Sequence, residues 1–236
     1  MDQAIGDADE GRDQAAGAAW MSWSSGKDSA FALHVARKQG IPVTTLLTTL
    51  NGEAERVAMH GVRRSLLEAQ AERLGLDVHL VDLPAPCPNE VYEELMRGAM
   101  ATATERGVDR VVFGDLFLDD VRQYREQALA PTSILPVFPI WGRPTDELAR
   151  EMLDAGIRAV LTCVDLAKMP IELVGRSFDA DLLADLPDGV DPCGERGEFH
   201  TFVWDGPGFR APIPIETGEI VVRDGFAFCD LDAAPV

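Results

Sequence analysis

Positive charge is scarce in this chain. Its 236 residues include 21 lysines and arginines against 40 aspartates and glutamates, which gives a net charge of −19. A surface this acidic repels phosphate backbones and anionic lipid headgroups. The composition therefore argues against a general DNA- or RNA-binding protein and against a protein that binds anionic membranes.

Paired cysteines and long apolar runs are also absent from the sequence. The four cysteines, Cys87, Cys163, Cys193 and Cys229, form no Cys-x-x-Cys pair, and no histidine lies at zinc-ligand spacing from them. Scattered reduced thiols of a cytosolic protein fit this spacing better than a disulfide framework. No stretch approaches the roughly 18 apolar residues of a membrane span, and residues 1–17 lack a signal-peptide pattern. We therefore expect a cytoplasmic protein.

Apolar residues make up 46% of the chain, enough for a sizeable core. Short apolar runs alternate with segments of helical periodicity, which predicts an α/β fold with a doubly wound, mostly parallel sheet. Two later segments, 199–204 and 219–230, predict a small antiparallel region with a turn at 223–225. The predicted strands of the main sheet are 18–23, 43–50, 76–83, 108–113, 134–140 and 158–164, and the predicted helices are 29–39, 60–74, 89–106 and 145–154.

The loop after the first predicted strand carries the clearest chemical signal. It reads Ser-Ser-Gly-Lys-Asp-Ser over 24–29, and a helix follows at once. Backbone N–H groups, the positive end of a helix, hydroxyls and Lys27 then point to one place, which predicts a cradle for phosphate or pyrophosphate. The spacing is neither that of a Walker P-loop nor that of a dinucleotide-binding loop. The alternative is an ordinary strand–helix turn in which Lys27 is merely solvated.

This loop resembles the Ser-Gly-Gly-x-Asp-Ser motif of the ATP pyrophosphatases, the PP-loop family, with Ser25 where that motif usually has glycine. Together with later motifs it is similar to the diphthine–ammonia ligase group of that family, over residues 20–216. The resemblance implies ATP-dependent amide synthesis through an acyl-adenylate, with release of AMP and pyrophosphate. It also implies an ATP-binding domain (19–130) and a C-terminal substrate-binding region (131–236), after residues 1–18, whose acidic and small residues predict a disordered tail. The later motifs are 113–115 (FGD), 135–141 (LPVFPIW), 175–179 (GRSFD) and 194–202 (GERGEFHTF).

The resemblance assigns the loop to ATP, with Lys27 neutralising charge as pyrophosphate leaves. Asp28 is a candidate Mg²⁺ ligand or a helix cap. Asp115, at the end of a strand, is a candidate for Mg²⁺ or for the reacting end of the substrate, or else a turn residue. The residues expected to contact the nucleotide are Ser24, Ser25, Gly26, Lys27, Asp28, Ser29, Thr48, Gly114 and Cys163.

Two glutamates in the most specific motif are further catalytic candidates. Glu195 and Glu198 could position ammonia, bind magnesium or act as a general base on ammonium, and the alternative is plain surface charge. His200 is a candidate proton acceptor or a structural histidine. The remaining candidates for substrate binding are Arg122, Arg125, Arg176 and Asp179, the last two with the alternative of a structural ion pair.

The leading hypothesis is thus an adenylating ligase that uses ATP, Mg²⁺, ammonia and a carboxylate. The carboxylate is diphthine on a translation factor, another protein side chain, or a small acid such as a cobalamin-related metabolite. A tRNA-modifying enzyme is disfavoured by the acidic charge and the unpaired cysteines. A nucleotide-binding sensor without ligase chemistry remains an alternative. An edge strand or the C-terminal hairpin could pair two chains into a homodimer.

Overall fold

The computed structural model describes residues 17–52, 55–57 and 60–234, so all but the end of the predicted acidic tail lies outside the described residues. Five parallel strands form the main sheet in the order β4-β2-β1-β5-β6, and the short β3 pairs antiparallel with the end of β2. The α/β prediction is therefore confirmed. The strands are β1 (Ala18–Ser22), β2 (Val43–Asn51), β3 (Arg56–Val57), β4 (Asp77–Leu83), β5 (Val108–Val112) and β6 (Leu135–Val137).

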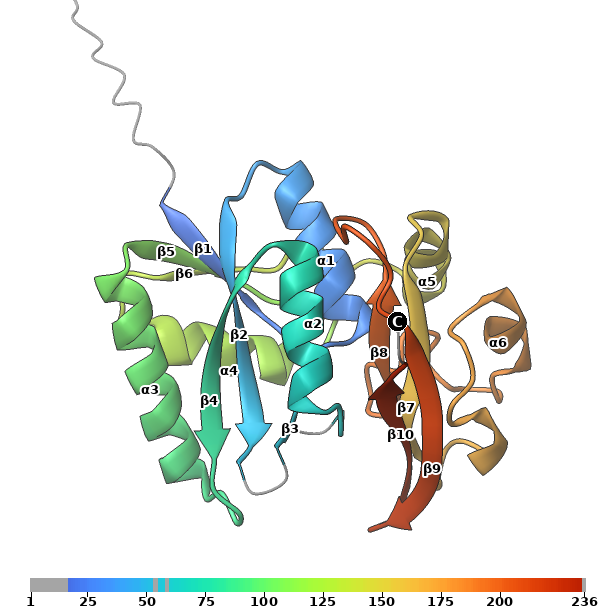
Figure 1. Ribbon diagram of the computed structural model, residues 1–236. Coiled ribbons are helices and arrows are strands. Elements are labelled where there is room, and N and C mark those ends of the chain that lie inside the picture. The colour runs from blue at the N-terminus through green and yellow to red at the C-terminus, as the bar shows by residue number, and fades with distance from the viewer. Residues whose placement is uncertain (1–16, 53–54, 58–59, 235–236) are drawn as a thin grey trace, which may run out of the picture.

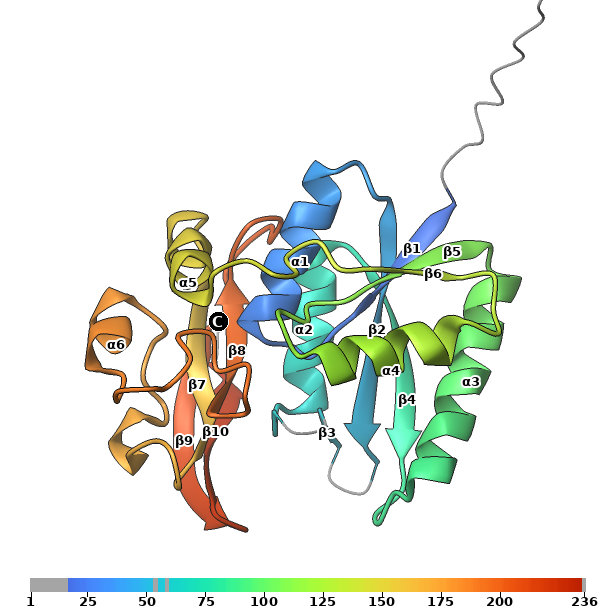
Figure 2. The same cartoon turned by 180° about the vertical axis from the view of Figure 1, so that it is seen from behind.

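Helices cover both faces of this sheet (Figures 1 and 2). On one face, α1 (Lys27–Lys38) and α2 (Arg64–Leu74) lie between the main sheet and a second sheet. On the other face lie α3 (Asn89–Glu105) and α4 (Asp119–Leu129). This is the arrangement that right-handed β-α-β connections produce around a parallel sheet.

Neighbouring residues of each strand pack into two separate hydrophobic cores, because successive side chains of a strand point to opposite faces of the sheet. Trp20 of β1 and Leu47 of β2 belong to the core under α3 and α4. Met21 and Leu46 belong to the larger core that includes α1, α2 and the second sheet. All four are at most 4% exposed. The near-continuous apolar character of these strands is thus explained by burial on both faces.

The second sheet is antiparallel, in the order β8-β7-β10-β9. Its strands are β7 (Arg158–Asp165), β8 (Phe199–Asp205), β9 (Ile215–Arg223) and β10 (Phe226–Ala233). The expectation that segment 158–164 extends the parallel sheet is wrong, since Cys163 of β7 pairs with His200 of β8 and Phe228 of β10. An apolar run indicates a buried strand but carries no information about which strands will pair with it.

The C-terminal hairpin is present where the sequence predicts it. Asp224 and Gly225 connect β9 to β10 and have φ angles of 53° and 84°. Both values are in the left-handed region, as in the type I′ turn that joins antiparallel strands through two residues. The remaining elements are α5 (Thr145–Asp154), which lies where predicted, the 3₁₀ turn η1 (Ile171–Leu173) and α6 (Ala180–Asp185).

Two helix starts differ from the predicted ones. The helix predicted from residue 29 begins at Lys27, and the helix predicted from residue 60 begins at Arg64, with His60 in a turn before it. Helix α3 begins at Asn89, as predicted, with Pro88 in the cap position. None of the helices in the described ranges is long and apolar enough to cross a membrane.

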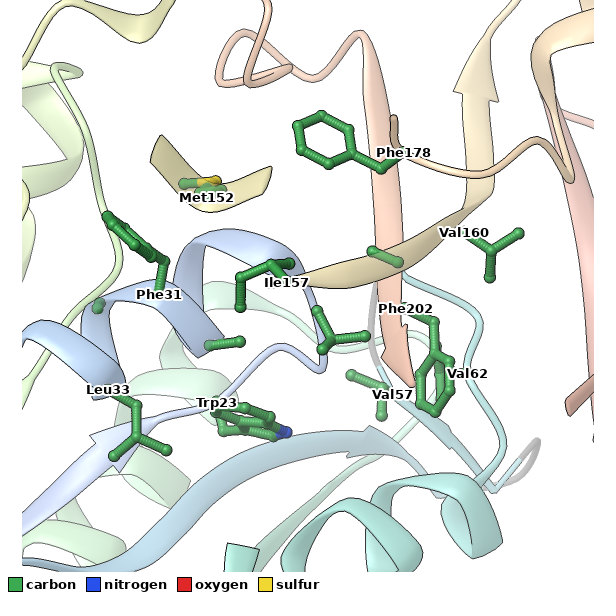
Figure 3. Close-up of a cluster of buried hydrophobic side chains, with 14 of the residues drawn as sticks. Trp23, Phe31, Leu33, Val57, Val62, Met152, Ile157, Val160, Phe178 and Phe202 are labelled. Atoms are coloured by element: carbon green, nitrogen blue, oxygen red, sulfur yellow. The ribbon is translucent and has the colours of Figure 1, made fainter. Parts of the chain in front are cut away.

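A buried glutamine joins the two sheets. Gln70 of α2 is fully buried, accepts a hydrogen bond from the Trp23 indole (2.9 Å), and donates to the carbonyls of Ser25 (3.1 Å) and Val203 (2.6 Å). Figure 3 shows the apolar side chains of this cluster, with Trp23 from the first half of the chain and Phe202 from the second. Strand β8 is thereby fixed against the loop that follows β1.

Candidate active site

The strand order reverses between β1 and β5, because the chain leaves β1 toward β2 and β4 and later returns on the other side of β1. In open parallel sheets, ligands bind outside the carboxyl ends of the strands at such a point. A cavity of about 650 Å³ lies there. The cavity is lined by the carboxyl ends of the main-sheet strands, the starts of α1 and α3, part of α4, and the segment before and within β8. The lining residues are Ser22, Ser24, Lys27, Asp28, Ser29, Thr49, His60, Leu83, Cys87, Asn89, Tyr92, Phe113, Gly114, Asp115, Arg125, Gly194, Glu195, Gly197, Phe199, His200 and Thr201.

The loop after β1 is held in shape by its own hydroxyls and by β8. The Ser29 hydroxyl donates to the Gly26 carbonyl (2.9 Å), and the Ser24 hydroxyl lies 3.2 Å from that of Ser29. The Lys27 N–H donates to the Thr201 hydroxyl (3.1 Å), and the Val203 N–H donates to the Ser25 carbonyl (2.9 Å). These contacts hold the start of α1, which lines the cavity, in a fixed position.

Lys27 is a buried cation at the base of the cavity. It is 1% exposed, its ammonium contacts the Asp28 carboxylate and the Cys193 carbonyl, and it lies 5.1 Å from the centre of the Phe199 ring. Burial alone would lower the pKa of Lys27, but the charges of Asp28 and Glu195 more than offset this and raise it. Lys27 is thus a fixed positive charge at the base of the cavity, beside the start of α1.

Gly114 brings β5 close to α1. A Cβ atom at Gly114 would lie 2.9 Å from the Ser29 nitrogen and 3.0 Å from the Asp28 carbonyl carbon. Those are backbone atoms that cannot move aside, so only glycine fits here. The close approach brings Asp115, the next residue, to the edge of the cavity near the start of α1.

Asp115 and Arg125 face each other across the cavity rim without a hydrogen bond. The Asp115 Oδ2 and Arg125 Nε atoms are 3.6 Å apart, and both are buried with no hydrogen-bond partner among the described residues. Burial raises the pKa of Asp115, and the Arg125 charge limits that rise. Buried polar atoms in native structures are usually paired, so this pair indicates a place for a polar ligand group or a cation.

Glu195 is a carboxylate of the cavity whose pKa is raised well above its usual range. Its Oε1 accepts the Leu116 N–H (2.8 Å), and its own N–H donates to the Asp191 carboxylate (2.9 Å). Burial, with smaller contributions from Asp28 and Asp115, raises its pKa to about 7. A carboxylate with a pKa near the working pH suits general acid–base catalysis.

Glu198 lies apart from the cavity. It is 2% exposed, and its Oε1 accepts the Asp191 N–H (3.2 Å). Because Asp191 in turn holds the Glu195 backbone, Glu198 supports the loop that presents Glu195. The two glutamates, alike in the sequence, therefore differ in what they contact.

Two histidines lie side by side in the cavity wall. The ring centres of His60 and His200 are 4.6 Å apart, and His60 Nδ1 lies 3.1 Å from the Thr201 carbonyl, where it donates. Burial, with smaller contributions from nearby positive charge, lowers their pKa values to about 3 and 4. Both rings are therefore neutral at pH 7.

Several other candidates lie away from the cavity. The Thr48 hydroxyl donates to the Trp23 carbonyl (2.9 Å), and Cys163 is buried in the second sheet. Arg122 pairs with Glu126 and stacks on Phe138 and Trp141.

Arg176 and Asp179 have structural roles but do not pair with each other. Arg176 pairs with Asp185 (2.7 Å), and Asp179 caps α6 by accepting the Leu182 N–H (2.8 Å). Neither lines the cavity.

Seven cavity residues lie outside the candidates and motifs that the sequence indicates. Most lie at or after the carboxyl end of a strand, which is the signal that could have found them. They are Ser22, Thr49, His60, Leu83, Cys87, Asn89 and Tyr92.

The donors present fit a magnesium ion that also binds nucleotide phosphates. In the described ranges, no group of three or more His, Cys, Asp or Glu side chains could hold a metal. Mg²⁺ is usually held by one or two carboxylates plus substrate phosphates rather than by a full protein cage. Asp28 and Asp115 line the same cavity. The Asp28 carboxylate contacts Lys27, and the Asp115 Oδ2 lies 3.6 Å from Arg125 Nε but has no hydrogen-bond partner among the described residues.

The chain matches two family models in succession. The model of the diphthamide synthase N-terminal domain matches residues 17–129, and that of the C-terminal domain matches residues 144–235. A diphthine–ammonia ligase of Danio rerio is 27% identical over 226 residues, which cover 87% of this chain and 89% of that protein. The human diphthine–ammonia ligase is 28% identical over 147 residues, and this match covers 55% of the human protein. The chain belongs to the diphthine–ammonia ligase-like group of the PP-loop ATP pyrophosphatase superfamily.

Proposed function

We propose that this protein is an ATP-dependent ligase that activates a carboxylate as its adenylate, releases pyrophosphate, and then forms an amide with ammonia. The observation that carries the proposal is the set of residues that line one cavity. The lining combines the start of α1 and Lys27, which suit phosphates, with Glu195, a carboxylate whose pKa is raised to about 7. In this proposal residues 19–130 bind ATP, and residues 131–236 supply Glu195 and the substrate-binding region.

In the first step, an oxygen of the substrate carboxylate attacks the α-phosphorus, and the bond from that phosphorus to the pyrophosphate oxygen breaks. Ser24, Ser29 and the N–H groups at the start of α1 hold the phosphates, and Lys27 stabilises the charge that develops on pyrophosphate. Asp28 and Asp115 would hold Mg²⁺, which supplies further neutralisation of that charge when bound.

In the second step, ammonia attacks the acyl carbon and AMP leaves. Ammonium is not a nucleophile until it loses a proton, and the Glu195 carboxylate accepts it. His60 and His200, neutral at pH 7, leave the cavity without extra positive charge beside the incoming cation. Arg125 lies where it can receive an anionic group of the substrate.

The proposal also concerns which carboxylate is activated. The relatives are named for diphthine and ammonia, and we propose that the carboxylate of this protein's substrate is diphthine, another protein side chain or a small acid. We also propose a cytoplasmic location, because the four cysteines are free thiols and three of them are buried.

Pyrophosphate release from Mg-ATP and ammonium tests this function. The acceptors are diphthine-bearing translation factor, a panel of carboxylates, and fractionated small-molecule extract. We expect release that depends on one acceptor, with AMP formed in equal amount. The Glu195→Gln variant is the matched control. Tight nucleotide binding without release under any acceptor would instead support a nucleotide sensor.

A further inference from the structure

Strand β9 is an exposed edge of the second sheet. It pairs with β10 on one side, and no described residue pairs with its other side. Figure 1 shows it at the outer side of the molecule, away from the main sheet. Ile220, Val221 and Val222 are 49%, 47% and 55% exposed. Edge strands usually carry charge or proline that blocks pairing, and these three residues carry neither.

The hairpin determines which backbone groups of β9 point outward. In a two-residue hairpin the closing pair, here Arg223 and Phe226, exchanges backbone hydrogen bonds. Residues alternate along the strand, so Val221 also points its N–H and C=O toward β10. Ile220 and Val222 point theirs to the free edge. A partner strand must therefore bond to Ile220 and Val222.

A second copy of the chain can do this about a two-fold axis. Antiparallel pairing requires outward-pointing residues to face one another, which restricts the axis to a residue rather than to a peptide bond between residues. With the axis at Val221, Ile220 faces Val222 of the other copy and exchanges hydrogen bonds with it. Val221 then faces Val221 of the other copy.

Charge selects this register among the possible ones. With the axis at Val221, Glu219 of each copy faces Arg223 of the other, so two opposite-charge pairs flank three apolar pairs. An axis at Ile220 or Val222 would set Glu219 or Arg223 against a valine. The Arg223 side chain is 73% exposed, and its contacts within the described residues are an ion pair with the exposed Asp224 carboxylate (3.7 Å) and the Phe228 ring (5.3 Å). An exposed ion pair of this kind is weak, so a partner carboxylate can replace it. Opposite charges directly across two strands stabilise their pairing.

We propose that two copies of this chain associate through β9, antiparallel and with the two-fold axis at Val221, so that their second sheets become continuous. The contact is small, and each copy carries a net charge of −19. Both features make the dimer weak and dependent on protein concentration. The inference is independent of the proposed ligase activity, because β9 contributes no residue to the cavity lining.

Sedimentation velocity over a range of concentrations, at physiological ionic strength, tests the pairing. We expect a monomer–dimer equilibrium in the wild-type chain. Glu219→Arg and Arg223→Glu each place like charges opposite each other and should raise the dissociation constant by about tenfold. The double variant restores opposite charges and should return the constant close to that of the wild type. Unchanged thermal unfolding in all three variants shows that the fold is intact.

Cysteine cross-linking tests the register. Side chains of a pair without mutual backbone hydrogen bonds are close enough to form a disulfide. Val221→Cys should therefore form a disulfide-linked dimer under mild oxidation. Val222→Cys and the wild-type chain, with its own four cysteines, are the controls and should not. A monomer at every concentration, a dimer insensitive to the charge reversals, or cross-linking at residue 222 instead of 221 would each overturn the proposal.

Discussion

Glu195 accepts a hydrogen bond from the backbone N–H of Leu116 at 2.8 Å, which joins two segments that are 79 residues apart in the chain. Leu116 follows Asp115, at the carboxyl end of β5. The contact places the glutamate from the segment before β8 next to the carboxyl end of β5 in the main sheet. It links the part of the cavity beside the start of α1 to the loop that leads into the second sheet.

The raised pKa of Glu195 predicts the pH dependence of amide formation. The carboxylate accepts a proton only when it is ionised, so the rate should rise with pH through about 7. Free ammonia also increases with pH, so hydroxylamine, which needs no deprotonation in this range, serves as a comparison nucleophile. The pH dependence should be weaker with hydroxylamine. Glu195→Gln should lower the rate with ammonium far more than with hydroxylamine, and an equal loss with both would argue against the base role.

Removal of the buried Lys27 charge should lower turnover by about 10²–10³ if that charge stabilises the transition state. Lys27→Met keeps the volume but leaves Asp28 without its partner, and breaking a buried ion pair costs about 3–5 kcal/mol. The Lys27→Met/Asp28→Asn double variant removes both charges. It should recover part of the lost stability to urea without recovering pyrophosphate release. Near-wild-type turnover in Lys27→Met would remove Lys27 from the mechanism.

Ser25 has a φ angle of 70°, in the region that favours glycine, and its buried hydroxyl has no hydrogen-bond partner among the described residues. Ser25→Gly should therefore raise the free energy of unfolding by about 1 kcal/mol, measured in urea. Ser25→Ala is the control, because it removes the unpaired hydroxyl but keeps the Cβ atom. A glycine variant no more stable than the alanine variant would show that backbone strain at this residue is small.

His60 and His200 should make the fold sensitive to acid. Their pKa values are lowered to about 3 and 4, whereas the unfolded chain binds these protons near pH 6.5. The unfolded state thus binds more protons below pH 6.5, so stability falls as the pH drops. Between pH 6.5 and 5 each histidine costs about 2 kcal/mol. The raised pKa of Glu195, about 7 against 4.5 in the unfolded chain, acts in the opposite direction throughout this range and offsets part of the loss.

The test is urea unfolding of the wild type and of His60→Gln at pH 7 and pH 5. The variant has one titrating group fewer, so its loss of stability on acidification should be smaller. His34→Gln is the comparison for a half-exposed histidine, whose pKa burial lowers less. An identical loss in the wild type and in His60→Gln would contradict the explanation.

The sequence by itself determined most of the strands and helices and their order, though not the short β3 and α6. Alternating apolar runs and helical segments predicted the parallel sheet, because local periodicity reflects which side chains must be buried. The loop at 24–29 and its place before a helix followed from its residue types. The hairpin turn followed from Asp224-Gly225, since a residue pair that tolerates positive φ favours a two-residue turn.

Tertiary structure alone decided which strands pair and which side chains meet. Thr48 and Thr49 are adjacent threonines, yet only Thr49 lines the cavity, because successive side chains of β2 point in opposite directions. Glu195 and Glu198 are similar in the sequence, and contacts with Leu116 and Asp191 separate their positions. Strand β7 joins the second sheet rather than the first. These outcomes depend on contacts between residues far apart in the chain, and local sequence patterns contain no record of such contacts.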